Sequence, residues 1–143
     1  MKRVLLALLA TVASSAVLAD DMAQIRQAMN NLQHEMTQCS AFFALSAACI
    51  EDMPKPDAKQ LAANYNRAGL EILGKAWEIG ASLGMTDDAM NSRAMLATDE
   101  MKELVSNSCT NVASALVRYG SSCKELYQTP DKALARLIQQ EAM

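Results

Sequence analysis

The chain has 143 residues, with 13 lysines and arginines against 16 aspartates and glutamates, which gives a formal net charge of −3. This length fits one domain that can bury a substantial core. The basic residues do not cluster as they do in proteins that bind nucleic acids, so we expect no nucleic-acid partner.

The first 19 residues have the three parts of a secretory signal peptide. Lys2 and Arg3 precede an apolar stretch, and small residues follow up to Ala19. The apolar run is shorter than the ~20 residues that a membrane-spanning helix needs. We therefore predict a cleaved signal peptide over residues 1–19 and a single helical domain without a membrane span over residues 20–143. The short charged segment is typical of bacteria, so the mature protein is expected to be periplasmic or secreted.

Helical spacing of apolar residues continues along the mature chain, and it predicts a long first helix over residues 22–50. Two prolines, Pro54 and Pro56, then end it. Its apolar face is expected to comprise Met22, Ile25, Met29, Leu32, Met36, Cys39, Phe43 and Ile50.

A second helix is predicted from Asp57, a candidate N-cap, to Leu83, with Gly84 ending it. Gly69, Gly74 and Gly80 lie inside it, and each costs up to ~1 kcal/mol against alanine in a helix interior. We therefore expect either a closely packed neighbouring helix at these glycines or a kink.

The third predicted helix covers residues 86–119, with Thr86 as its N-cap, and Gly120 and the two serines that follow it mark the end. A short fourth helix begins at Thr129 and Pro130. The connections are short, so neighbouring helices should run antiparallel.

Four cysteines in an exported chain predict two disulfides. Cys39 and Cys49 would lie ~15 Å apart along one continuous helix, whereas bonded cysteines have Cα atoms ~4.4–6.8 Å apart. In an up-down-up arrangement the first and third helices are parallel, which places Cys39 level with Cys109 and Cys49 near Cys123. The predicted pairs are therefore Cys39 with Cys109 and Cys49 with Cys123.

These bridges also predict the architecture. The first and third helices of a square four-helix bundle are diagonal and too far apart for a disulfide. We therefore predict an all-α fold, with three long antiparallel helices in a triangular bundle and two disulfides joining the first and third helices. The short C-terminal helix should lie over one end or groove of this bundle.

The sequence carries no motif for phosphate binding, a zincin site or covalent haem, so we predict a protein that is not an enzyme and has no cofactor. The single histidine, His34, is expected to be an exposed residue of the first helix. Met29 and Met36 are one heptad apart, which is ordinary core spacing for a flexible apolar side chain. The alternative is that these thioethers and His34 bind Cu(I), which would make the protein a periplasmic copper-binding or carrier protein.

Leu70, Leu73 and Trp77 form a second apolar stripe on the second predicted helix. Either the short C-terminal helix covers this stripe, or it is exposed and marks a partner site, in which Trp77 would be the main anchor. We favour a small exported, disulfide-stabilised helical protein that acts as a non-enzymatic protein-binding or accessory module of the cell envelope. Its partner would be an envelope or secreted protein that the sequence does not identify.

Overall fold

The computed structural model describes the backbone of residues 2–143 and the side chains of residues 19–143, and all regular secondary structure in this part is helical. The elements are α1 (Lys2–Glu51), α2 (Ala58–Ser82), α3 (Asp87–Leu104), the 3₁₀ turn η1 (Cys109–Asn111), α4 (Val112–Gln128) and α5 (Pro130–Glu141). The predicted all-α class and the two disulfides are confirmed. The predicted signal peptide, residues 1–19, lies almost wholly outside the residues whose side chains are described. Among the described residues, no helix is both long enough and apolar enough to cross a membrane.

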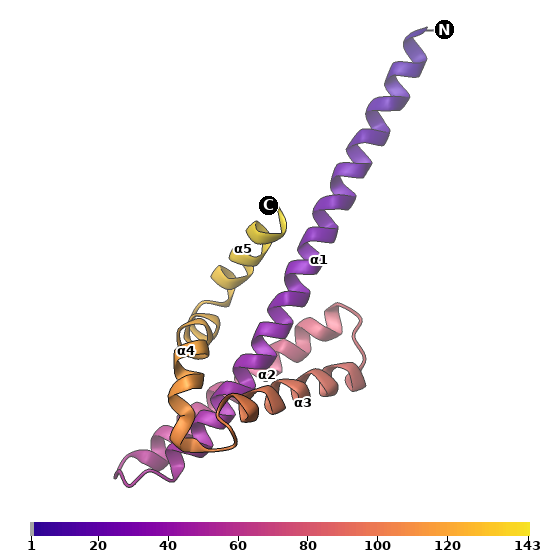
Figure 1. The fold of residues 1–143 in the computed structure, drawn as a ribbon. Helices are drawn as coiled ribbons and strands as arrows, with labels where there is room; N and C mark the ends of the chain where they lie inside the picture. The colour runs from indigo at the N-terminus through magenta and orange to yellow at the C-terminus, as the bar shows by residue number, and fades with distance from the viewer. Residues whose placement is uncertain (1) are drawn as a thin grey trace.

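The central element is α1, and α2, α3, α4 and α5 each pack against it (Figure 1). In Figure 1, α4 and α5 follow one side of α1, whereas the hairpin of α2 and α3 projects on the other side. Because it is surrounded, α1 buries polar residues such as Gln33 and Thr37 as well as apolar residues such as Met36 and Phe42. In place of the predicted triangle of three long helices with single apolar faces, the structure has one central helix enclosed by the others.

The N-terminal part of the predicted apolar face on α1 is not core. Met22 is 66% exposed and Ile25 is 39% exposed, whereas Ala28 is fully buried. The last turn of α2 ends beside this point, where the Arg26 guanidinium donates to the carbonyl oxygen of Leu83 at 2.8 Å. Residues 19–25 lie at or beyond the end of α2, and all of them except Gln24 are exposed.

The turn between α2 and α3 is the one that the sequence predicts. Gly84 has φ 78°, and the N–H of Met85 donates to the carbonyl oxygen of Gly80 at 2.9 Å, as in a Schellman motif. Thr86 then caps α3, because its Oγ1 accepts from the N–H of Ala89 at 3.2 Å.

The predicted third helix is wrong, because the chain reverses direction after Leu104. Ser106 and Asn107 have φ 51° and 55°, and the N–H of Asn107 donates to the carbonyl oxygen of Lys102 at 2.8 Å. This is again a Schellman type of ending, but a serine occupies the left-handed position where glycine is usual. The prediction relied on Gly120 as the stop signal, yet α4 continues through it.

The predicted disulfide pairing is also wrong, for the same reason. The bonded pairs are Cys39 with Cys123 and Cys49 with Cys109, each with a Cα–Cα distance of 5.2 Å. After the reversal, α4 runs antiparallel to α1, so Cys109 lies level with Cys49 and Cys123 lies level with Cys39. The bridges therefore join α1 to α4 and to η1, instead of joining it to one long third helix.

An aromatic cluster holds α1, α2 and α4 together near the bridges. The ring of Phe43 lies 5.4 Å from Phe42, 5.7 Å from Tyr65 and 6.0 Å from Tyr127 between centroids. Phe42 also lies 6.3 Å from Tyr119, which extends the cluster along α4. These contacts set the position of α2 on α1, and hence the position of the apolar stripe that α2 carries.

Candidate functional site

Two residues of the predicted stripe, Leu70 and Leu73, lie on the side of α2 that faces α3. Leu70 and Leu73 line a pocket of about 210 Å³ between α1, α2 and α3, which we call the hairpin groove. Its other lining residues are Thr37, Ser40, Ala41, Ala44, Asn66, Gly69, Ala94 and Thr98. Trp77 follows Leu73 by one helical turn and therefore continues the same wall toward the α2–α3 turn.

The C-terminal helix does not bury the whole of this stripe. It packs against α1 and α4, and Leu70 remains 67% exposed. Leu73 and Trp77 are half-buried. Leu70 and Leu73 thus form a partly open apolar wall of the groove, whereas Trp77 is not among the residues that line it.

The hairpin groove is lined mainly by small side chains, and two of its hydroxyls have partners within their own helices. Thr37 Oγ1 donates to the carbonyl oxygen of Gln33 at 2.8 Å, and Thr98 Oγ1 donates to that of Ala94 at 2.9 Å. A side chain entering the groove would meet mainly carbon, together with the polar side chains of Ser40 and Asn66. Chemically, the groove is suited to apolar contact.

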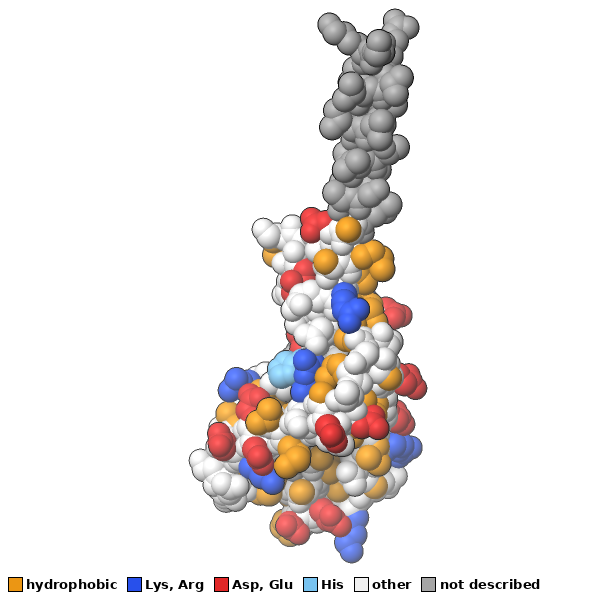
Figure 2. Space-filling view, turned by 90° about the vertical axis from the view of Figure 1, so that its right-hand side faces the viewer, with side chains coloured by type: hydrophobic (Ala, Val, Ile, Leu, Met, Phe, Trp, Pro, Cys, Tyr) orange, Lys and Arg blue, Asp and Glu red, His pale blue; other side chains and the backbone are white. Residues whose placement is uncertain are grey.

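The surface seen from the right-hand side of Figure 1 has no large area of one charge. Figure 2 shows red, blue and orange side chains interspersed over the coloured part of this face. Long-range attraction to a strongly charged partner would need a large area of one charge, so recognition here would depend on local shape and apolar contact.

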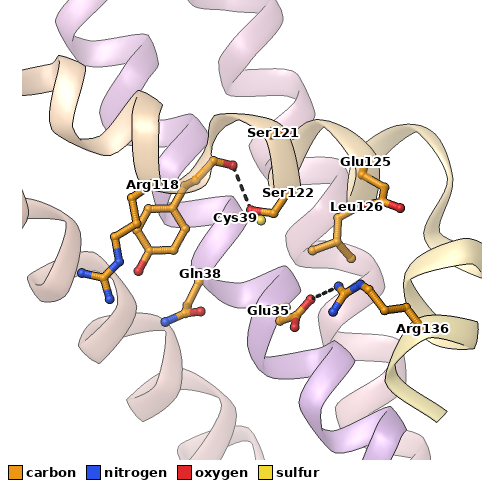
Figure 3. Close-up of a pocket in the computed structure, with 10 residues that line it drawn as sticks. Glu35, Gln38, Cys39, Arg118, Ser121, Ser122, Glu125, Leu126 and Arg136 are labelled. Atoms are coloured by element: carbon orange, nitrogen blue, oxygen red, sulfur yellow. Dashed lines mark hydrogen bonds and ion pairs between the residues drawn. The ribbon is translucent and has the colours of Figure 1, made fainter. Parts of the chain in front are cut away.

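A second, polar pocket, which the sequence did not predict, lies where α4 meets α5 above α1, and we call it the elbow pocket (Figure 3). Its volume is about 520 Å³. The lining residues are Glu35, Gln38, Cys39, Arg118, Tyr119, Ser121, Ser122, Glu125, Leu126 and Arg136. Across it, the guanidinium of Arg136 donates to the Glu35 carboxylate at 2.9 Å.

Glu100 of α3 lies beside the elbow pocket, where three side chains contact its carboxylate. Its carboxylate accepts from Tyr119 Oη at 2.6 Å and from Gln38 Nε2 at 3.0 Å, and it lies 3.5 Å from the Arg118 guanidinium. The hydrogen bond from Tyr119 is the main cause that lowers the pKa of Glu100. Burial, together with the same hydrogen bond, raises the pKa of Tyr119 to about 12. At neutral pH Glu100 is therefore ionised and Tyr119 is protonated, so neither is suited to exchange protons with a substrate.

The residues of the copper alternative do not converge. Met36 is 1% exposed and belongs to the core, Met29 is half-buried, and His34 is exposed. Met29 and Met36 are two helical turns apart on α1, ~10 Å along its axis. Within the described part of the chain, no group of three or more His, Cys, Asp or Glu side chains is placed to hold a metal ion.

The elbow pocket had no signal in the sequence. Its charged residues come from distant positions, Glu35, Arg118, Glu125 and Arg136, and they meet only because α4 and α5 fold back along α1. No protein-family model, curated protein or solved structure matches this chain. Functional inference therefore depends on the geometry of the two pockets.

Proposed function

We propose that residues 20–143 are the mature form of an exported, periplasmic helical module that binds an envelope or secreted protein through the hairpin groove. The observation that carries the proposal is the partly open wall of Leu70 and Leu73 beside a floor of small side chains, with Trp77 one helical turn beyond Leu73. Exposed apolar surface of this kind marks interaction sites in soluble proteins. Aromatic anchors such as Trp77 commonly supply much of the affinity.

The disulfides support the location, because two such bonds fit an oxidising, non-cytoplasmic compartment. The side-chain chemistry supports a role other than catalysis. All four cysteines are bonded, so no thiol is present as a nucleophile, and the one histidine is exposed. A scaffold cross-linked at two points is well suited to presenting a fixed surface.

Site-specific photo-crosslinking in intact cells tests this proposal. Leu70 is replaced by benzoylphenylalanine, which is tolerated because the side chain is already 67% exposed. Leu96 of α3 is the matched control, since it is 70% exposed. It also lies two residues from both Ala94 and Thr98 and is therefore on the face of α3 away from the groove.

We expect light to produce one specific heterologous product from position 70 and none from position 96. Leu70→Glu should abolish binding of the partner so identified, whereas Leu96→Glu should retain it. Equal products from both positions, or none from position 70, would overturn the proposal. A product with the mass of two copies of this chain would assign the groove to self-association instead.

A further inference from the structure

The two disulfides lie in opposite environments. Cys39 and Cys123 are 2% and 0% exposed, so their bridge is almost completely buried, although Cys39 lies at the wall of the elbow pocket. Cys49 is 4% exposed, but its partner Cys109 is exposed and lies at the start of the short turn η1. Thiol–disulfide exchange requires access to a sulfur atom. The two bridges should therefore differ in reactivity.

The backbone before Cys109 adds a second difference. Ser106 and Asn107 both have positive φ values, 51° and 55°, a conformation that non-glycine residues adopt at a cost. The turn is anchored at one end by Val105, which is 1% exposed, and by a 3.1 Å hydrogen bond from Asn111 Nδ2 to the Val105 carbonyl oxygen. Such strained backbone persists where the surrounding structure holds it in place. The bond to Cys49 is the covalent part of that restraint.

We propose that Cys49–Cys109 is a site of thiol–disulfide exchange with an external dithiol, and that Cys39–Cys123 is a permanent structural bridge. A thiolate of the dithiol attacks Sγ of Cys109, forms a mixed disulfide, and expels Cys49 as a thiolate that takes a proton from water. The second thiolate of the dithiol then attacks the sulfur atom that the dithiol contributed to the mixed disulfide. This releases Cys109 as a thiolate, which also takes a proton from water. The external dithiol is oxidised to its disulfide, and the protein gains two electrons and two protons.

Opening this bridge has a local consequence. Residues 105–111 lose their covalent tie to the C-terminal end of α1, whereas α4 remains tied to α1 through Cys39 and Cys123. The reduced protein should therefore keep its helices and loosen only the turn. This inference does not depend on the partner proposed for the hairpin groove.

Partial reduction under native conditions tests the assignment. The purified oxidised protein is treated with dithiothreitol, sampled over time, alkylated with N-ethylmaleimide and mapped by peptide mass. We expect Cys49 and Cys109 to be labelled at least about tenfold faster than Cys39 and Cys123, because the first bridge has an exposed half and the second is almost completely buried. Hydrogen exchange should rise in residues 105–111 and stay unchanged in the middle of α4.

A double variant, Cys49→Ser with Cys109→Ser, tests whether Cys39–Cys123 resists reduction by itself or only while the Cys49–Cys109 bridge is present. Its remaining bridge should be as slow to reduce as in the parent protein. Equal reduction rates for the two bridges in the parent protein, or earlier opening of Cys39–Cys123, would overturn the proposal. Fast reduction of Cys39–Cys123 in the double variant would also overturn it, because that bridge would then not be permanent.

Discussion

The glycines of α2 test how tightly α2 packs on α1. Although three glycines lie inside it, α2 is one uninterrupted helix, and the expectation of close packing holds at Gly69. A Cβ added at Gly69 would lie 3.2 Å from Phe43 Cβ and 3.3 Å from the Ser40 carbonyl oxygen, both in α1. At Gly74, one and a half turns further along, an added Cβ would have no atom within 4 Å. The two positions therefore form a matched pair within one helix.

The expected effects have opposite signs. Alanine in place of glycine in a helix interior gains up to ~1 kcal/mol, and this is the whole effect at Gly74. At Gly69 the same gain is opposed by overpacking, which costs ~1–3 kcal/mol in a well-packed core. The carbonyl oxygen of Ser40 belongs to the helix backbone and cannot move aside as a flexible side chain can. Gly69→Ala should therefore be ~1–3 kcal/mol less stable than Gly74→Ala.

Urea unfolding of the two oxidised variants, followed by circular dichroism at 222 nm, measures this difference. In thermal unfolding it should correspond to roughly 3–5 °C per kcal/mol for a domain of this size. Equal stabilisation by both substitutions would refute the argument, because it would mean that α2 and α1 are not in close contact at Gly69. A loss at Gly74 as large as that at Gly69 would refute the assignment of open space there.

Two further predictions concern pH and export. The lowered pKa of Glu100 means that its contribution to stability is present above its ordinary value of 4.5 and is lost as the pH falls through the folded-state pKa. The raised pKa of Tyr119 means that its contribution is present below pH 10 and is lost as the pH rises from 10 to about 12. Thermal unfolding measured across these two pH ranges should therefore show both losses of stability. Glu100→Gln should reduce both losses. An unchanged pH profile in that variant would contradict the role of the hydrogen bond from Tyr119 to Glu100. Intact mass of the oxidised protein isolated from its native compartment should correspond to a chain beginning at Asp20 and lacking four hydrogens, two for each disulfide. A chain that retains Met1, or in which Cys39 and Cys123 are free thiols, would contradict export.

The sequence predicted the features that local chemistry determines. The end of α1 before Pro54, the left-handed Gly84 and the cap at Thr86 each depend on a residue type with a strong conformational preference. The α2 stripe was also predictable, because helical periodicity alone places Leu70, Leu73 and Trp77 on one face.

The reversal after Leu104 was not predicted, because neither glycine nor proline marks it. Ser106 takes the left-handed conformation there, and only the short polar stretch of Ser106, Asn107 and Ser108 gave a turn signal. Missing that reversal made the predicted third helix parallel to α1 over its whole length, and the wrong disulfide pairing followed directly. The elbow pocket depends on the same reversal, and so it could not have been predicted either.

The positions of the disulfides have a consequence for the hairpin groove. Both bridges tie α1 to the segment after the reversal, that is, to η1 and α4. The helices that form the walls of the groove, α2 and α3, have no covalent tie to α1 among the described residues, because all four cysteines lie outside them. The width of the groove is therefore set by non-covalent contacts, which include the hydrogen bond from Gln38 of α1 to Glu100 of α3, and the close approach at Gly69 is part of its floor. If Gly69→Ala pushes α2 away from α1, the yield of the crosslinked product from position 70 should change in that variant. Gly74→Ala should leave this yield as it is in the parent protein.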